Sequence, residues 1–551
     1  MNTITNNGLP PSLAPETLAA EDPSGTRLIS HLANEIYSEL QRRVPASVPR
    51  TAPPSGDSMA VLPVHPEHAT LVDQTPKRAT PSSGAAGAEN SHSFGEPHCE
   101  TSHGDSKSAV EPGLDHPSNF SATPDYYFLQ SNDVRAGTAQ PASPALASGW
   151  DIGSVRRDFP ALHQHVNGRP LIWLDNAATT HKPQAVIDAT SRFYARDNSN
   201  IHRAAHALAV RSTDLFEGAR EKVRKFLGAS SAKEIIFVRG TTEGINLVAQ
   251  SFGRKNIGAG DEIILTELEH HANIVPWQLL AEQTGAVLRV VPINDRGEVI
   301  LEEYAKLLGP RTKIVSVGHV SNALGTITPI EEIIALAHAR GVPVLVDGAQ
   351  STPHFPVNVT ALDVDFFVFS AHKVFGPTGI GALYGKAPLL ESMPPWQGGG
   401  HMIKDVRFEK TTYQNAPEKF EAGTPDIAGA AGLGAAIDYV SKIGLPALAA
   451  YEHSLLEYAT EALSSVPGLR PIGTAASKAS VLSFVIPGVS TESIARHLDQ
   501  HGIAVRAGHH CAQPAHRHFG LESTVRPSLA FYNTRDEVDA LVRALRLLRR
   551  S

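Results

Sequence analysis

From residue 151 onward, short apolar runs alternate with longer stretches whose apolar positions recur every three to four residues. The short runs, rich in β-branched and aromatic residues, cover 234–238, 262–266, 287–292, 313–317, 342–346 and 365–370. Helical periodicity fills the intervals, for example at 243–252, 274–284 and 330–340. Such alternation is typical of strands and helices that follow one another along the chain. It predicts an α/β fold in which helices cover both faces of a mostly parallel sheet.

The pattern changes again near residue 416. Residues 416–551 have longer helical stretches and fewer strand-like runs, which indicates a smaller α+β domain. We therefore expect a large sheet domain over residues 151–415, whose first residues contribute to the small domain, and a small C-terminal domain over 416–551.

Residues 1–150 lack this alternation. They are rich in Pro, Ser, Gly, Ala and His, with too few large apolar side chains to offset chain entropy, so a disordered extension is predicted. Two apolar segments interrupt it. Residues 24–43 show helical spacing of apolar positions after Ser24, a favourable N-cap, and residues 126–129 read Tyr-Tyr-Phe-Leu. An isolated helix this short is marginal in water, so residues 24–43 are expected to fold on a partner.

Charge follows the same boundary. Residues 1–150 hold 8 Lys and Arg against 16 Asp and Glu, which accounts for the whole net charge of −8. The remaining chain has no basic excess for binding a nucleic-acid backbone. It also has no apolar run of the roughly 18 residues that a membrane span needs. Without a secretory signal pattern, and with 2 cysteines, a disulfide-stabilised secreted protein is excluded. We expect a cytoplasmic protein with neither nucleic acid nor membrane as partner.

Polar residues that could catalyse a reaction or bind a ligand follow the predicted strands. Asp347 and Lys373 come after two successive runs, a Gly-Thr-Thr turn at 240–242 opens a helix, and His270 follows a third run. Ligands of open α/β sheets bind at the carboxyl ends of the strands, where these residues would meet. Pyridoxal phosphate (PLP) would use all of them: a lysine for a Schiff base, a carboxylate for the pyridine nitrogen, and a helix N-terminus for the phosphate. Each feature alone is more often a surface lysine, a turn residue or a plain N-cap.

Longer motifs carry a family resemblance. The segments V-D-G-A-Q (346–350), S-A-H-K (370–373), E-H-H-A-N-I-V-P-W (269–277) and H-V-S-N-A-L-G-T (319–326) closely resemble PLP-dependent cysteine desulfurases. So do F-E-A-G-T-P (420–425) and R-A-G-H-H-C (506–511). The resemblance is to the SufS-like, group II branch of the class V aminotransferase family. It runs from about residue 155 to the C-terminus, and it implies PLP fold type I and a homodimer.

The resemblance also implies a role for individual residues. Lys373 would form the Schiff base, Asp347 would pair with the pyridinium, Gln350 would hydrogen-bond the phenolic oxygen, and His270 would stack on the ring. Phosphate would be held by Thr241, Thr242, Ser370 and His372, with Thr424 contributed by the other subunit. The substrate would be bound by Asn322 and Arg526, with Arg203 reaching the partner subunit's site and Arg506 close to the catalytic loop.

Cys511 selects the reaction that the resemblance implies. Lys373 would remove the Cα proton of L-cysteine, Cys511 would attack the substrate sulfur, and His270 would act as acid or base near the leaving sulfur. The products would be L-alanine and a Cys511 persulfide. A metal cluster of His509, His510, Cys511, His516 and His518 is the competing interpretation. It is disfavoured because adjacent side chains seldom converge on one ion, so no metal is expected.

Partners remain open at this point. The short 506–511 loop resembles the branch that uses a dedicated sulfur acceptor, such as a SufE-like protein. The R-L-I-S-H-L-A-N-E-I-Y-S-E-L segment (27–40) resembles the loading segment of desulfurases packaged in family 2 encapsulin shells. The expectation is therefore an encapsulin shell partner bound through residues 24–43 and 126–129, and a location inside that nanocompartment in the cytoplasm. The alternatives are a selenocysteine lyase and a scaffold protein with a vestigial PLP domain.

Overall fold

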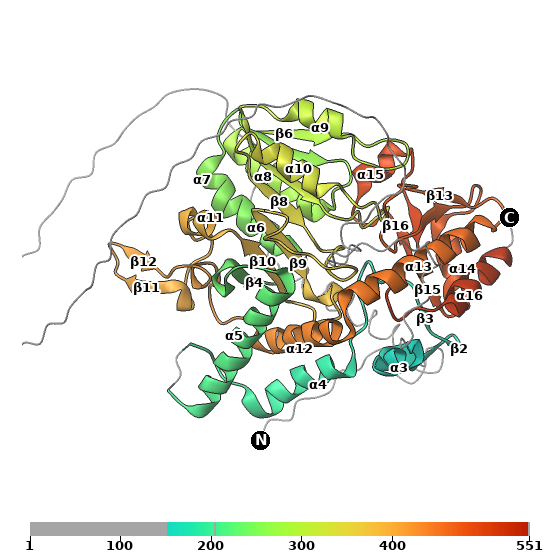
Figure 1. Cartoon of the computed structure of the whole chain (residues 1–551), viewed down its shortest axis with the longest axis horizontal. Helices are drawn as coiled ribbons and strands as arrows, with labels where there is room; N and C mark the ends of the chain where they lie inside the picture. The colour runs from blue at the N-terminus through green and yellow to red at the C-terminus, as the bar shows by residue number, and fades with distance from the viewer. Residues whose placement is uncertain (1–150, 203–204, 549–551) are drawn as a thin grey trace, which may run out of the picture. The chain divides into compact units, whose positions relative to one another are not determined.

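A computed structural model describes residues 151–202 and 205–548 of the chain (Figure 1). The predicted extension 1–150, its segments 24–43 and 126–129, and Arg203 lie outside the described residues.

A seven-stranded sheet forms the centre of the large domain, in the order β4-β10-β9-β8-β7-β5-β6. Its strands are β4 (Ile235–Val238), β5 (Glu262–Thr266), β6 (Val287–Val291), β7 (Thr312–Gly318), β8 (Val344–Asp347), β9 (Phe366–Ser370) and β10 (Gly381–Gly385). All pairings are parallel except those of β10 with β4 and with β9. The predicted α/β fold with a mostly parallel sheet is confirmed.

Helices cover both faces of this sheet because its strands are apolar on both sides. Phe367 and Phe369 of β9 belong to one buried cluster, whereas Phe366 and Val368 belong to another. Alternate residues of a strand point to opposite faces, so the two clusters lie on opposite sides. The first contains side chains of α5 (Ala207–Leu227), α9 (Leu301–Leu307), α10 (Ile330–His338) and α12 (Ile427–Ile443). The second contains those of α6 (Thr241–Val248) and α8 (Val275–Thr284).

The smaller part contains an antiparallel sheet of order β13-β14-β17-β16. Its strands are β13 (Arg470–Ile472), β14 (Ser483–Val485), β17 (Thr524–Arg526) and β16 (Arg506–Gly508). A separate buried cluster joins it to α13 (Leu445–Ser464), α14 (Thr491–Gln500) and α16 (Arg535–Arg546). The strand β3 (Ile172–Trp173) pairs in parallel with β15 (Ile503–Ala504), so residues from the start of the described chain join this part. The α12 helix, by contrast, packs on α5 and on α4 (Gln184–Arg192) of the large domain.

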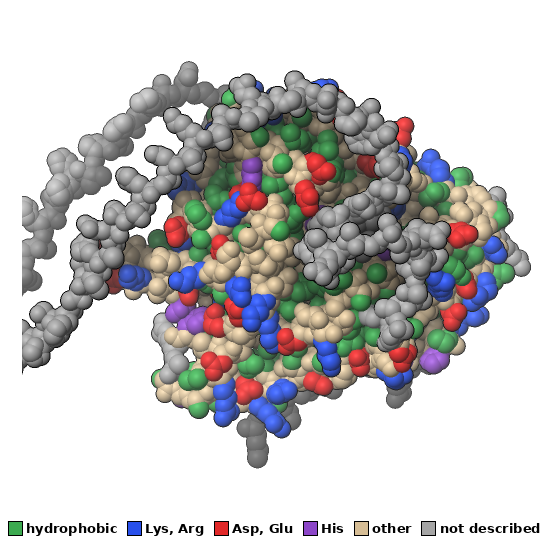
Figure 2. Space-filling model, in the orientation of Figure 1, with side chains coloured by type: hydrophobic (Ala, Val, Ile, Leu, Met, Phe, Trp, Pro, Cys, Tyr) green, Lys and Arg blue, Asp and Glu red, His purple; other side chains and the backbone are tan. Residues whose placement is uncertain are grey.

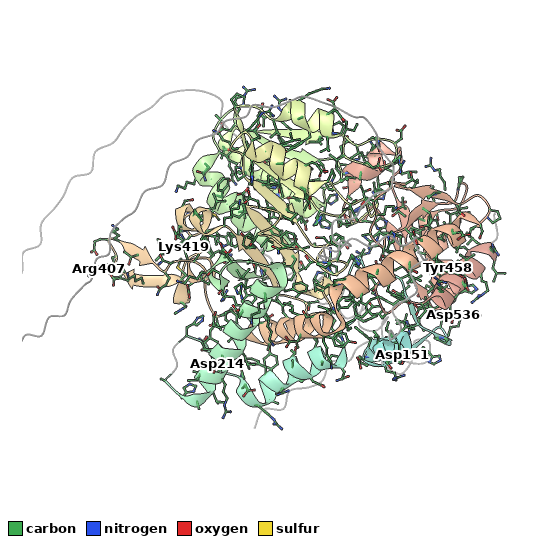
Figure 3. All side chains as sticks on the ribbon, viewed as in Figure 1. Asp151, Asp214, Arg407, Lys419, Tyr458 and Asp536 are labelled. Carbon is green, nitrogen blue, oxygen red and sulfur yellow. The ribbon has the colours of Figure 1, made fainter. Side chains whose placement is uncertain are left out.

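The remaining regular elements are short. They are α3 (Ile152–Arg157), β1 (His165–Val166), β2 (Arg169–Pro170), α7 (Arg254–Asn256), α11 (Ala387–Ser392), β11 (Ile403–Val406), β12 (Thr411–Tyr413) and α15 (Gln513–His518). The hairpin β11–β12 turns at Arg407, which Figure 3 shows at its tip. Figure 2 shows acidic and basic side chains interspersed over the visible face.

Among the described helices, none alone is long and apolar enough to cross a membrane. The pair α12 and α13 passes that test of length and composition only when joined, and its two helices are bent by 75°.

Candidate active site

A cavity of about 190 Å³ lies at the carboxyl ends of β5, β7, β8 and β9, the edge where the sequence predicted chemistry. The structure brings twelve predicted site residues to its wall: Thr241, Thr242, His270, Asn322, Asp347, Gln350, Ser370, His372, Lys373, Arg506, Cys511 and Arg526. Thr424 does not line it; it lines two other cavities and accepts a hydrogen bond from Asn200 (3.4 Å). Arg203 lies outside the described residues.

Asp347 is the last residue of β8, buried at the end of the strand. Its Oδ1 accepts a hydrogen bond from the Ala349 N–H at 2.9 Å, and burial raises its pKa. The following residue, Gly348, permits this turn: a Cβ there would lie 1.9 Å from Cζ of Phe367. A buried carboxylate of this kind is stabilised by a cation or an N–H donor, which the cavity would have to provide.

Lys373 ends the 3-10 turn η8 (Ala371–Lys373), directly after β9. Burial lowers its pKa to about 8, with Asp347 opposing and Arg526 and Arg506 reinforcing the shift. With this pKa about a tenth of the amine is neutral at pH 7, and the neutral amine is the form that attacks carbonyl groups and accepts protons.

The N-terminus of α6 forms another side of the cavity. Gly240 caps the helix without a side-chain hydrogen bond. The Thr241 N–H donates to Oγ of Ser370 at 2.8 Å, and the two hydroxyls are 2.9 Å apart. Helix N-terminal N–H groups beside clustered hydroxyls favour an anion. His372 adds a neutral donor, because burial lowers its pKa to about 4.

His270 is held as a neutral ring. Its Nδ1 accepts the Ala272 N–H at 3.0 Å, so the proton resides on Nε2. Burial lowers its pKa to about 3, with further lowering by Lys373, His271 and Arg526. In the unliganded protein His270 is therefore a hydrogen-bond donor through Nε2, and its ring is suited to stacking on an aromatic ligand.

Arg526 is almost fully buried in β17. It donates to Oδ1 of Asp175 (2.8 Å) and to the Asn322 carbonyl (2.9 Å). Its buried Nε has no hydrogen-bond partner within the described part of the chain, which leaves a donor for a ligand. Arg506, half exposed, lies 3.6 Å from the other carboxylate oxygen of Asp175.

The loop that carries Cys511 is unusual in its backbone. His510 and Cys511 have φ of 51° and 55°, a left-handed conformation that costs on the order of 1–3 kcal/mol per non-glycine residue. Contacts from two other segments restrain it. The His271 N–H donates to the Cys511 carbonyl at 2.7 Å, and the Asn322 side-chain amide donates to the His510 carbonyl at 2.5 Å. These two hydrogen bonds hold Cys511 at the wall of the cavity.

The five-residue metal cluster considered from the sequence does not assemble. His510 and His516 both contact Oγ1 of Thr524, at 2.9 and 3.1 Å, and His518 pairs with Glu267 at 3.1 Å.

Sequence reasoning missed three residues of this site. Asp175 anchors both arginines, Glu269 lies buried under the cavity, and His271 holds the cysteine loop. Glu269 and His271 follow β5, so the rule that identified Asp347 and Lys373 would have found them. Asp175 follows the two-residue β3, for which no strand was predicted and which lies outside the large sheet. Glu269 accepts from Thr266 and Asn273, both at 2.6 Å, and burial raises its pKa to about 7.

These residues fit PLP. Asp347 would pair with the protonated pyridine, and Lys373 would hold the aldehyde carbon. The α6 N-terminus with Ser370 and His372 would hold the phosphate. Gln350 has one N–H on the Ala177 carbonyl (2.6 Å), which leaves its second N–H for the phenolic oxygen.

Comparison with known proteins agrees with this arrangement. The chain matches the aminotransferase class-V family over residues 172–541. It is 53% identical over 560 residues to a cysteine desulfurase of Synechococcus elongatus, across 98% of this chain and 87% of that protein. A probable cysteine desulfurase of Vibrio cholerae is 51% identical over 395 residues, across 72% of this chain and 98% of the relative.

A solved structure shares the fold as well as the sequence. The crystal structure of the Escherichia coli cysteine desulfurase CsdA, in its S-sulfonic acid form, aligns with a TM-score of 0.67 at 44% identity, across 72% of this chain and 97% of that one. The chain therefore belongs to the aminotransferase class-V family, as one of its PLP-dependent cysteine desulfurases.

Proposed function

We propose that the enzyme converts L-cysteine to L-alanine and holds the released sulfur as a persulfide on Cys511. The observation that carries the proposal is the position of Cys511, which lines one cavity with Lys373, Asp347 and Arg526 on a loop fixed from two sides.

Each residue of the site has its own role in the proposed reaction. Bound PLP supplies an electron sink that labilises the Cα proton and the Cβ–S bond of the substrate. Arg526, which lines the cavity, binds the substrate carboxylate, and Asp175 fixes its guanidinium. Lys373, whose amine is partly neutral, moves the Cα proton. His270 donates a hydrogen bond from Nε2 toward the departing sulfur.

Cys511 acts last. Its thiolate attacks the substrate sulfur, an S–S bond forms, and the Cβ–S bond breaks. The electron pair of that bond stays on the substrate carbon, which takes up protons and leaves as alanine. The restrained loop avoids the entropy cost of positioning the nucleophile at each turnover.

The test is alanine formation by the PLP-loaded full-length enzyme and by Cys511→Ser and Cys99→Ser variants. Alanine formation from cysteine should fall at least ~100-fold in Cys511→Ser and remain unchanged in Cys99→Ser. Undiminished alanine formation by Cys511→Ser would remove the nucleophile from the mechanism. Selenocysteine turnover retained by Cys511→Ser fits the desulfurase, whereas wild-type turnover restricted to selenocysteine would favour a selenocysteine lyase.

The short loop that carries Cys511 indicates which kind of sulfur acceptor the enzyme uses. Only His509 and His510 separate β16 from Cys511, and the loop is held by His271 and Asn322. A thiol so restrained cannot travel to a distant acceptor, so the acceptor must come to it, as a SufE-like protein does for the group II desulfurases. Stimulation of turnover by such a protein, greater than by a small thiol at equal concentration, is the expected result. Equal stimulation by both would argue against a dedicated acceptor.

The N-terminal extension is proposed to load the enzyme into an encapsulin shell in the cytoplasm, through residues 24–43 and 126–129. Support comes from the segment's resemblance to such loading sequences. Deleting residues 1–50 should abolish co-purification with a family 2 shell protein and leave desulfurase activity intact. Packaging that survives the deletion would refute this assignment.

A further inference from the structure

Three potential metal ligands meet at the mouth of the active site. The side chains of His271, His509 and Cys511 each offer a ligand atom, and these atoms all lie within 4.8 Å of one another. Within residues 151–202 and 205–548, no other group of three His, Cys, Asp or Glu side chains meets this criterion. His509 is exposed and the other two are half-buried, so an ion from solvent can reach them.

Backbone contacts hold this group together before any ion binds. Besides the bond from the His271 N–H to the Cys511 carbonyl, the Gln513 N–H donates to Nε2 of His271 at 3.2 Å. The Cys511 N–H donates to Nδ1 of His509 at 3.0 Å. The two imidazole rings lie 5.5 Å apart at an interplanar angle of 31°. Because Nε2 of His271 and Nδ1 of His509 accept these backbone bonds, each neutral ring carries its proton on the other nitrogen. A metal ion bound at that other nitrogen would therefore displace the ring proton to the accepting nitrogen and replace the backbone hydrogen bond.

The spacing suits a tetrahedral ion. Zinc binds imidazole nitrogen at ~2.0–2.1 Å and thiolate sulfur at ~2.3 Å, so two nitrogens and one sulfur around a tetrahedral ion stand about 3.3–3.6 Å apart. The three ligand atoms, within 4.8 Å of one another, would have to approach by up to about 1.5 Å. Two imidazoles and a thiolate select zinc over magnesium or calcium, which prefer oxygen ligands.

Positive charge around the group opposes a cation, and one carboxylate cancels part of it. Burial lowers the pKa of His271, and Arg517 is close enough to lower it further. Arg506 and Arg526 line the same cavity and would repel a cation, but Asp175 pairs with both, at 3.6 and 2.8 Å. The repulsion from these guanidinium groups is thereby partly cancelled.

We infer that His271, His509 and Cys511 form a zinc-binding site that inhibits the enzyme reversibly. The inference rests on the proposed role of Cys511 as the sulfur-accepting nucleophile. On binding, the Cys511 thiol releases its proton to solvent, Sγ bonds to the metal, and water fills the fourth position. Sulfur bonded to zinc cannot attack the substrate, so sulfur transfer stops until the metal is removed.

The test measures binding without turnover. The protein is the full-length, PLP-loaded chain with Cys99→Ser, which leaves Cys511 as the single thiol, and no cysteine substrate is added. Zinc is titrated calorimetrically, and cobalt reports thiolate coordination through its visible spectrum. One equivalent should bind, Cys511→Ser should abolish the cobalt–thiolate signal, and His271→Gln and His509→Gln should each weaken zinc binding ~10-fold or more.

His518→Gln is the matched control, because His518 lies on the neighbouring α15 and pairs with Glu267 outside the group. This variant should bind zinc as the parent does. Binding that is unchanged in both His271→Gln and His509→Gln would overturn the site, as would the absence of stoichiometric binding in the parent. The binding measurements involve no turnover, so they are independent of the alanine-formation assay that tests the persulfide. If zinc binds at this site but Cys511→Ser still forms alanine at the parental rate, the zinc site stands and only the inhibition is refuted.

Discussion

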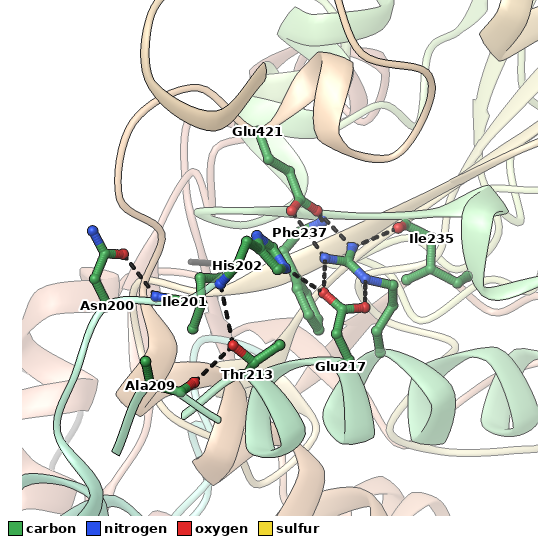
Figure 4. A network of polar contacts seen from close by, with 10 residues as sticks. Asn200, Ile201, His202, Ala209, Thr213, Glu217, Ile235, Phe237 and Glu421 are labelled. Atoms are coloured by element: carbon green, nitrogen blue, oxygen red, sulfur yellow. Dashed lines mark hydrogen bonds and ion pairs between the residues drawn. The ribbon is translucent and has the colours of Figure 1, made fainter. Parts of the chain in front are cut away.

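A buried arginine in α5 supports the region around Thr424, and its replacement gives a quantitative prediction. Arg220 lies between the carboxylates of Glu421 and Glu217, which are labelled in Figure 4. It donates to Glu421 at 2.6 and 2.9 Å and to Glu217 at 2.9 and 3.2 Å. A further N–H goes to the Ile235 carbonyl at 2.8 Å. Arg220 is 1% exposed, and the guanidinium also lies over the Phe237 ring at 4.8 Å.

Arg220→Met keeps most of the side-chain volume and removes the charge. The Glu421 carboxylate, only 6% exposed, is then left without its cation. Breaking a buried pair in this way costs ~3–5 kcal/mol. With an unfolding entropy of ~2.1 cal/mol/K per residue over roughly 400 residues, that loss lowers the melting temperature by about 4–6 °C.

The assay is a double-mutant cycle by thermal and urea unfolding of the PLP-loaded enzyme. Glu421→Gln is the partner variant, because its amide oxygen still accepts the Phe237 N–H that Glu421 accepts at 2.7 Å. If the charge pair is responsible, the loss of unfolding free energy in the double variant should be smaller than the sum of the two single losses by ~2 kcal/mol or more. Additivity within ~0.5 kcal/mol would refute this reasoning.

Three further predictions concern the site itself. Glu269→Gln should reduce the pH dependence of stability. Burial raises the Glu269 pKa to about 7, so the wild-type free energy of unfolding falls as pH rises from ~4.5 to 7. The melting temperatures at pH 5 and pH 8 should therefore differ less in the variant than in the wild type. Gly348→Ala forces a Cβ to 1.9 Å from Phe367, so it should cost ~1–3 kcal/mol and speed PLP release, measured by cofactor absorbance. Arg526→Lys loses the fork that joins Asp175 and the Asn322 carbonyl, so KM for cysteine should rise ~10-fold or more in steady-state assays. An unchanged pH profile, cofactor release rate or KM would contradict the respective assignment.

The sequence predicted the parts of this site that obey a local rule. Asp347, Lys373 and His270 follow apolar runs, and the carboxyl ends of parallel strands meet at one edge. Strand β10 escaped prediction because its five residues begin and end with glycine and bury every position, a pattern without alternation.

Long-range contacts were beyond sequence reasoning. The His271 N–H meets the Cys511 carbonyl across 240 positions, and nothing in either segment specifies the other. The left-handed backbone of His510 and Cys511 was equally hidden, because only a few per cent of non-glycine residues adopt it and no turn signal marks these two positions. The pairing of Asp175 with Arg526 depends on how the small domain meets the large one, which periodicity does not determine.

The central claim is that sulfur from cysteine resides on Cys511, and peptide mass spectrometry after a single turnover tests it most directly. The PLP-loaded enzyme is mixed with stoichiometric L-cysteine, alkylated to trap persulfides, and digested. The account predicts one added sulfur on the peptide that contains Cys511, none on the peptide that contains Cys99, and alanine in equal amount. Alanine formed without any sulfur on Cys511 would contradict the account.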